Sequence, residues 1–312
     1  MSEDPQVSNP NKVMFPEPGY TKADVVGHYR RVAEPFLAFA AGRPLTLQRF
    51  PGGLGSKGFM QKNAGRYFPD AIARFEVPTQ DGGITRYPVI AEGDTDALVY
   101  LVNQGTLTFH TWTTSVAEPD RPDWLVLDLD PHPGDLDGVR AVTAAVGELG
   151  RQVGLAGFPV ATGSSGFHVW YPLDRSATQE EAAMATRALA GIVAARHPEV
   201  ATVEFLKKDR GGRVFVDWLR NRPIATVVVP FSLRPKPAAP VAVPLRWDEL
   251  AGAVPDGWPL GDHAAIDERV VVAGELTAAT RPQPLDLERI VALARAADVD
   301  LDTPFDRFGR DR

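Results

Sequence analysis

The chain has 312 residues, 44% of them hydrophobic and 23% charged, with a formal net charge of -7 and no cysteine. This composition is typical of a soluble globular protein with one large domain or two ordinary ones, and it excludes disulfides, zinc–thiolate sites and thiol nucleophiles. The sequence has no run of about 18 or more apolar residues and no secretory signal pattern, which argues against export or membrane insertion, and its net acidity argues against a histone-like positive coat.

Helical periodicity begins after a polar N-terminal stretch. Thr21 and Asp24 form a capping-box pattern ahead of apolar residues at helical spacing, which predicts a helix over residues 21–42. We expect Pro35 to kink this helix, because proline lacks the amide hydrogen that a helix interior needs. The following predicted elements are strands over 44–50, 59–63 and 85–90, a glycine-rich loop over 51–58, a helix over 95–105 and a strand over 106–112.

Strands and helices also alternate in the second half of the chain. The predicted elements are a strand from Trp124, helices over 135–154, 178–198 and 285–299, and strands over 158–163, 167–173, 213–219 and 224–231. The prolines of 234–247 predict an irregular wrap over the surface. This alternation indicates an α/β or α+β fold with a mixed sheet. We expect one unit of two lobes over residues 11–295, a flexible N-terminus over 1–10 and a C-terminal tail over 296–312.

Two acids interrupt the apolar strand WLVLDLD. Asp128 and Asp130 share one strand face, whereas the leucines between them point to the other face. Their backbones lie about 7 Å apart, so the two carboxylates can converge on one hard cation such as Mg²⁺ or Mn²⁺. Such an ion also removes the repulsion between them. The alternative interpretation is a pair of strand-end acids that face solvent before a Pro-x-Pro-Gly turn.

A third acid, Asp217, ends the apolar strand RVFVDWL. Two strands that bring acids to one point can build a two-metal site, which stabilises the attacking and leaving oxygens of phosphoryl transfer. The alternative for Asp217 is an ion pair with a neighbouring arginine.

The loop TGSSGFH, residues 162–168, can present backbone amides and three hydroxyls to a triphosphate, although a glycine–serine hairpin turn looks the same. His168 and His110 are either phosphate contacts or satisfied strand histidines. Arginine forks suit phosphate oxygens, and the alternative is ordinary surface charge. The arginines near Asp217 in sequence are Arg213, Arg220, Arg222 and Arg234.

Basic residues near the N-terminus are interleaved with aromatic ones. This pattern suits a nucleic-acid backbone with a base stacked on a ring. The alternative is a solvated charged face with Phe59 in the core. The basic residues concerned are Lys12, Lys22, Arg49, Lys57 and Lys62.

Taken together, these stretches resemble the polymerase domain of bacterial DNA ligase D, within the archaeo-eukaryotic primase superfamily. The resemblance is collinear over nearly the whole chain. It runs through NPNKVMFPEPGYTKADVVGHYRRVAEPFL, RPLTLQRFPGG, GFMQKN, FHTW, PDWLVLDLDP, TGSSGFHVWYPL, RVFVDWLRN and PFSLRP. It implies a two-lobed primase-like fold with mixed or antiparallel sheets, flanking helices and an active site between the lobes. It also implies metal-dependent, template-directed addition of nucleotides to a primer 3′-hydroxyl at gaps or double-strand breaks.

The resemblance assigns roles to residues at matching positions. Asp128, Asp130 and Asp217 become catalytic ligands of two Mn²⁺ or Mg²⁺ ions. The nucleotide-binding positions are Thr162, Ser164, Ser165, His168, His110, Arg220 and Arg234. The DNA-binding positions are Asn9, Lys12, Lys22, Arg49 and Phe59, where the lysines contact a 5′-phosphate and Phe59 stacks on a template base.

The chain departs from the family pattern Ser-Gly-Gly-Lys-Gly-x-His at Ser165, where the lysine is missing, and at Arg220, where the family has glutamine. As a hypothesis, Arg220 restores the lost positive charge. The resemblance implies a preference for ribonucleotides, binding of NTPs or dNTPs and of 5′-phosphorylated DNA, and cooperation with Ku and a separate ligase. We expect a stand-alone, cytoplasmic, nucleoid-associated bacterial protein that does not bind membranes.

Two alternatives from other functional classes are open. A non-catalytic module that binds 5′-phosphorylated DNA ends would keep the fold without turnover. A haloacid-dehalogenase-type phosphatase would use LVLDLDP as its Asp-x-Asp motif, although Pro131 departs from that motif and Asp217 would then be unexplained.

Overall fold

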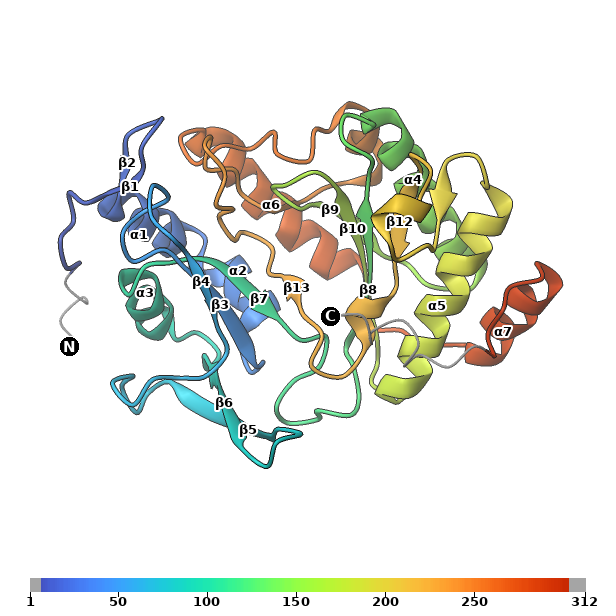
Figure 1. Cartoon of the computed structure of the whole chain (residues 1–312), viewed down its shortest axis with the longest axis horizontal. Coiled ribbons are helices and arrows are strands. Elements are labelled where there is room, and N and C mark those ends of the chain that lie inside the picture. The colour runs from blue at the N-terminus through green and yellow to red at the C-terminus, as the bar shows by residue number, and fades with distance from the viewer. Residues whose placement is uncertain (1–6, 303–312) are drawn as a thin grey trace.

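The structure, a computed structural model, describes residues 7–302 of the chain, which form two lobes around two separate sheets (Figure 1). The chain builds most of the first lobe, crosses to the second before Trp124, and returns to the first sheet with a short strand at 227–228. The mixed and antiparallel sheets with flanking helices confirm the predicted fold class. No helix in the described part of the chain combines the length and apolar character that crossing a bilayer requires.

The first lobe contains an antiparallel sheet of order β13–β7–β3–β4. Three helices pack around it and two hairpins flank it. The strands are β1 (Val13–Phe15), β2 (Tyr20–Thr21), β3 (Leu45–Arg49), β4 (Phe59–Gln61), β5 (Ala73–Pro78), β6 (Ile84–Val89), β7 (Thr106–Thr111) and β13 (Val227–Val228), and the helices are α1 (Lys22–Arg31), α2 (Ala33–Ala40) and α3 (Thr95–Asn103).

The second lobe contains a six-stranded sheet of order β11–β12–β8–β10–β9–β14, in which only the β11–β12 pair is parallel. Its strands are β8 (Trp124–Asp130), β9 (Phe158–Ala161), β10 (Phe167–Pro172), β11 (Ala201–Thr202), β12 (Val214–Asp217) and β14 (Val243–Pro244). Its helices are α4 (Leu136–Gln152), α5 (Gln179–Arg196), α6 (His263–Ala279) and α7 (Leu287–Ala296), with short 3-10 turns η1 (Lys207–Asp209), η2 (Leu219–Asn221) and η3 (Trp247–Gly252).

The central strand β8 has two unlike faces, as the sequence predicts. Leu125, Leu127 and Leu129 are fully buried, and helices α4 and α5 pack against this strand. Burial of a leucine side chain contributes about 1.5–3 kcal/mol, so this face fixes the strand in the core. The opposite face carries the buried Val126 and then the two aspartates.

The predicted helix over 21–42 is two helices. Its start is confirmed, because Thr21 and Asp24 form the capping box. The chain leaves helical geometry at Val32, and α2 begins at Ala33. Pro35 lies in the first turn of α2, where an amide hydrogen has no partner within the helix, so proline is accommodated by a restart rather than by a kink.

One other expectation differs from the structure. The segment 234–247 is not a surface wrap: Val241, Val243 and Leu245 are fully buried, and β14 pairs with β9. Its proline at 244 is tolerated because β14 is an edge strand. Helix α6 and strands β1, β2, β5 and β11 were not predicted. Residues 1–6 and 303–312 of the predicted N-terminus and tail lie outside the described residues, and the domain boundaries stay a prediction.

Candidate metal centre

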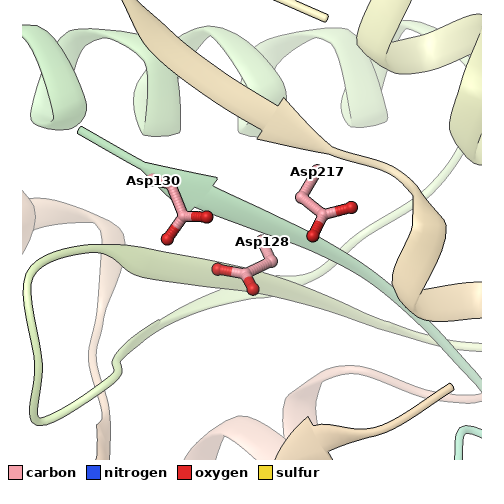
Figure 2. A group of neighbouring side chains, drawn as sticks. All are labelled: Asp128, Asp130 and Asp217. Atoms are coloured by element: carbon pink, nitrogen blue, oxygen red, sulfur yellow. The ribbon is translucent and has the colours of Figure 1, made fainter. Parts of the chain in front are cut away.

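Strand register brings the three predicted acids together. Asp217 of β12 lies directly opposite Asp128 of β8, and Phe215 lies opposite Asp130. Residues opposite each other in an antiparallel pair point to the same face. All three carboxylates therefore gather on the face of the sheet that β8 leaves free of leucine (Figure 2), and each offers an oxygen within 4.8 Å of the others.

A histidine extends this row across the neighbouring strand. His168 of β10 is the register partner of Asp128, on the side away from β12. Its Nε2 lies 3.3 Å from Asp128 Oδ1. His168 is buried, and its Nδ1 has no hydrogen-bond partner. The row Asp217–Asp128–His168 thus crosses three adjacent strands.

Arg220 bridges two of the acids. Its Nε lies 3.0 Å from Asp128 Oδ2 and 3.0 Å from Asp217 Oδ2. Turn η2, which follows β12 directly, places this side chain, and the Leu219 amide donates to Asp217 Oδ1 over 2.9 Å. Asp130 forms no ion pair with any residue in 7–302.

The three acids have unequal pKa values. Burial, together with the charges of Asp128 and Asp217, raises the pKa of Asp130 to about 6. Burial and Asp128 also raise the pKa of Asp217, against the opposing charge of Arg220. Burial acts upward on Asp128 too, but His168 and Arg220 outweigh it and hold its pKa well below its usual range. Arg220 pairs with two of the three acids and leaves Asp130 without an ion pair in the described part of the chain, and this charge and the hard oxygen donors fit a divalent cation.

A cavity of about 160 Å³ opens beside the acids, between the two sheets. The first lobe contributes His110, Val227 and Val228, and the second contributes Asp128 and Asp130. The structure brings all seven predicted nucleotide-binding residues to this cavity. They are Thr162, Ser164, Ser165, His168, His110, Arg220 and Arg234.

The loop between β9 and β10 approaches β8 closely. A Cβ at Gly166 would clash with the carbonyl oxygen of Leu129, and Gly163 has a φ of +65° with Arg234 beside it. The Thr162 hydroxyl donates to the Gly166 carbonyl over 2.7 Å, so it closes the turn. Only glycine permits this combination of approach and backbone angle.

Besides His168 Nδ1, two buried polar atoms at the cavity have no hydrogen-bond partner among residues 7–302. They are His110 Nε2 and Arg234 Nε, while Arg234 Nη1 donates to the Thr162 carbonyl over 2.9 Å. Burial and the charge of Arg234 lower the pKa of His110 to about 3, so this histidine is neutral. Buried donors without acceptors are rare in proteins, and here they favour a ligand rich in acceptor oxygens.

The predicted DNA-binding residues form two groups. Lys12 and Lys22 lie together near Asn9: Lys12 Nζ donates to the Pro51 carbonyl over 2.5 Å, and Lys22 Nζ donates to the Ser8 carbonyl over 2.9 Å. Burial, with the charge of Lys12, lowers the pKa of Lys22. Asn9 has a φ of 51° and accepts from the Lys12 amide, which turns the chain here.

Arg49 and Phe59 form the second group, as register partners on β3 and β4. Phe59 is 47% exposed, so the alternative that places it in the core is wrong. The Arg49 guanidinium lies 5.5 Å from its ring centre and donates to the Gln104 carbonyl and the Tyr67 hydroxyl. The guanidinium of Arg49 therefore packs against one face of the exposed Phe59 ring.

A second, larger cavity of about 910 Å³ meets the first at Asp130, Arg220 and Thr226. Its basic lining includes Lys207 and Arg210, which sequence reasoning missed. The signal was the basic run KKDR at 207–210, between two strands. The other basic residues of the lining are Lys62, Arg220 and Arg222.

Comparison with known proteins agrees with this geometry. A family model described as LigD, primase-polymerase domain, matches residues 21–269. The multifunctional non-homologous end joining protein LigD of Mycolicibacterium smegmatis is 30% identical over 293 residues, which are 92% of this chain and 37% of that protein. Its counterpart from Mycobacterium tuberculosis is 35% identical over 254 residues, 78% of this chain and 33% of the relative.

A solved structure is also similar. It is described as the polymerase domain of Mycobacterium tuberculosis ligase D in complex with DNA, with a TM-score of 0.78, 32% identity and coverage of 86% of this chain and 94% of that one. The chain spans about a third of the length of the curated relatives. The strand-borne acids, the two-lobed fold and these similarities lead to one conclusion: the chain belongs to the LigD primase-polymerase domain family.

Proposed function

We propose that this protein is a template-dependent nucleotidyltransferase that adds nucleotides to a primer 3′-hydroxyl at DNA gaps or double-strand breaks. The observation that carries this proposal is the position of three converging carboxylates where a polar cavity meets a larger cavity that is lined by apolar and basic side chains. Membership of a primase-polymerase family supports it and leaves the phosphatase alternative without support.

Asp128, Asp130 and Asp217 would hold two divalent ions, Mg²⁺ or Mn²⁺. When bound, such ions supply activation of the attacking hydroxyl and stabilisation of the leaving pyrophosphate. His168 positions Asp128 through their 3.3 Å contact. Arg220 holds Asp128 and Asp217 in place and offsets part of their charge.

The smaller cavity would take the nucleoside triphosphate. Arg234 offers its free Nε, and Ser164 and Ser165 line the loop side. His110, being neutral, offers a hydrogen bond without adding charge. The ribonucleotide preference of this pocket is part of the proposal and rests on the resemblance rather than on a contact to a sugar hydroxyl.

The larger cavity would take the primer strand. In-line transfer requires the attacking and leaving oxygens to lie on opposite sides of the phosphorus. With the triphosphate in one cavity, the 3′-hydroxyl must approach from the other, past Asp130 and Asp217. Basic side chains such as Lys207 and Arg210 suit the phosphates of that strand, and the exposed Leu206 and Ile224 offer apolar contact.

DNA ends would lie along the first lobe. Lys12 and Lys22 would bind a 5′-phosphate, and Phe59 would stack on a template base. Relatives described as non-homologous end joining proteins support a role in that repair pathway. The bacterial cytoplasm as its location and Ku and a ligase as its partners are part of the proposal and follow from the resemblance. The DNA in the similar ligase D polymerase structure supports the same substrate class.

Nucleotide addition on gapped DNA tests this function. We expect the wild-type protein to extend the primer with Mn²⁺ or Mg²⁺, more readily with a 5′-phosphate at the gap and with NTPs than with dNTPs. The double variant Asp128→Asn/Asp130→Asn should lose about a thousandfold in rate, because it removes the charge that holds the ions. Gel analysis of labelled primers measures the rate.

The matched control is Asp267→Asn, an exposed acid on α6 that pairs with Arg31 at the surface. Circular dichroism should show that all variants are folded. Undiminished extension by the double aspartate variant would overturn the mechanism. Tight binding of gapped DNA by the wild type without any incorporation would instead support the non-catalytic end-binding alternative, which the arginine bridge over Asp128 and Asp217 makes worth testing.

A further inference from the structure

The segment 229–234, between β13 and β14, carries Arg234 to the smaller cavity in an unusual backbone conformation. Phe231 has a φ of 69° and is fully buried. This left-handed region favours glycine, and a bulky residue stays in it only when the surroundings enforce it. Such an outlier beside a site is a reason to ask which contacts enforce it.

Three buried side chains of the first lobe hold this segment from one side. His28 Nε2 donates to the Phe231 carbonyl over 2.9 Å, and Thr108 Oγ1 donates to the Leu233 carbonyl over 2.6 Å. The Tyr29 hydroxyl accepts from the Leu233 amide over 3.1 Å and donates to the Leu107 carbonyl over 2.5 Å. Tyr29 thereby ties the segment to strand β7.

The second lobe holds the same segment from the other side. The Phe231 amide donates to the Ala242 carbonyl over 2.6 Å, and the Arg234 amide donates to the Pro240 carbonyl over 2.8 Å. The Arg234 side chain reaches the Thr162 carbonyl, and its Nε remains without a protein partner at the cavity. The guanidinium is therefore aimed by contacts from both lobes.

We propose that Tyr29, assisted by His28 and Thr108, is a positioning residue for the incoming nucleotide: it fixes the backbone of 231–233 so that Arg234 meets the triphosphate without reorganisation. None of the three side chains lines the nucleotide cavity, so their effect on binding passes through Arg234. This inference rests on the proposed nucleotidyltransferase function. Pre-organisation of the Arg234 guanidinium strengthens nucleotide binding, because the side chain then loses less conformational entropy when the nucleotide binds.

The variant Tyr29→Phe tests it. We expect the KM for the nucleotide to rise about tenfold, since a buried amide loses its partner and Arg234 loses its fixed position. The kcat at saturating nucleotide and the affinity for gapped DNA should stay within about twofold of wild type. Steady-state primer extension and fluorescence anisotropy of labelled DNA measure these quantities.

The matched control is Tyr171→Phe. Tyr171 is equally buried, and its hydroxyl donates to the Val146 carbonyl over 2.8 Å in the core of the second lobe. It should lose stability in thermal unfolding as Tyr29→Phe does, while its nucleotide KM stays unchanged. A KM that rises equally in both variants would reduce Tyr29 to a structural residue and overturn the inference.

A double-mutant cycle with Arg234→Gln separates the remaining outcomes. If Tyr29 acts through Arg234, adding Tyr29→Phe to Arg234→Gln leaves the KM unchanged, whereas multiplied effects would overturn the inference. If Tyr29→Phe does not fold, Thr108→Val removes the neighbouring donor with little change of shape and enters the same cycle. A wild-type protein that binds no nucleotide defeats the proposed function itself, whereas a wild type sensitive to Arg234→Gln but not to Tyr29→Phe defeats only this inference.

Discussion

At the scale of single residues, Asp217 satisfies both interpretations that the sequence left open. It pairs with a nearby arginine, Arg220, and it also completes the acidic cluster with Asp128 and Asp130. The two roles are compatible because the guanidinium bridges only two of the three carboxylates. Asp130 is left without an ion pair among residues 7–302 and with a raised pKa, so a cation bound beside it would offset the repulsion among the three carboxylates.

The buried His28 predicts how the stability of the protein depends on pH. Burial, aided by the charges of His263 and Arg31, lowers its pKa from 6.5 to about 4, against the opposing effect of the Phe231 carbonyl. A lowered pKa means that the neutral form stabilises the fold above pH 6.5, and this contribution is lost as the pH falls toward 4. When the pH falls from 7 to 5, we expect the free energy of unfolding to drop by about 2 kcal/mol less in His28→Asn than in the wild-type protein.

Urea unfolding at the two pH values measures this difference. Exposed His132, which follows β8, gives the comparison: if His28 carries the acid sensitivity, His28→Asn changes the pH dependence more than His132→Asn does. Equal losses for the wild-type protein and His28→Asn would show that His28 does not carry the acid sensitivity.

At the scale of elements, the sequence predicted those whose pattern is local. The alternation of side chains in β8 and the capping box at Thr21 each depend on residues that are close together in the sequence, and the structure contains both. Helix α6 escaped prediction because its apolar residues do not form one stripe, although Asp262 gives it a capping signal through the Ala265 amide. Segment 234–247 was misjudged because only its neighbour β9 makes it part of a sheet.

The candidate site was likewise predictable where a local sequence pattern places its residues. Period-two alternation put Asp128 and Asp130 on one face from the sequence alone. The contact of Arg220 with Asp128 joins residues far apart in the chain, and so do the contacts of Tyr29 and its neighbours with the segment before Arg234. No local pattern records these contacts. The role of Arg49 beneath Phe59 likewise depends on strand register.

The loop between β9 and β10 makes a prediction at this scale. Gly166→Ala places a methyl group against the Leu129 carbonyl, so the loop must move away from β8. We expect the nucleotide KM to rise about tenfold or more and the free energy of unfolding to fall by about 1–3 kcal/mol. Primer extension and chemical denaturation measure the two effects.

Gly27→Ala is its control, because Gly27 lies within α1 with open space around its Cα. Alanine there should stabilise the protein by about 0.5–1 kcal/mol and leave the KM unchanged. A Gly166→Ala protein with wild-type nucleotide affinity would show that the tight loop does not shape the pocket.

At the scale of the whole molecule, a buried ion pair joins the lobes. Arg43, between α2 and β3, donates through both terminal nitrogens to Asp123, just before β8, with 2.7 Å on each side. Arg175 donates to the same carboxylate over 2.8 Å. These contacts, with segment 229–234, connect the two halves of the site across the fold.

We expect the loss of the Arg43–Asp123 pair to lower the stability of the protein and to leave the rate of nucleotide addition unchanged. Arg43→Ala leaves Asp123 buried with only Arg175, which should cost about 3–5 kcal/mol of unfolding free energy. Thermal unfolding measures the loss, and kcat per folded molecule should be unchanged. The surface pair Arg246–Glu275, in which Arg246 also contacts Glu249, is the control: Arg246→Ala should cost far less than Arg43→Ala. Equal costs for the two variants would contradict this account.

The return of β13 to the first sheet also bears on how the protein is made. The strand that completes that sheet ends at Val228, after five of the six strands of the second sheet have already appeared in the sequence. During synthesis from the N-terminus, the sheet of the first lobe therefore cannot be completed before most of the second lobe has emerged from the ribosome. The edge of β7 that pairs with β13 stays unpaired during that interval, so the two lobes complete their folding together. A chain truncated before residue 227 would leave both sheets incomplete.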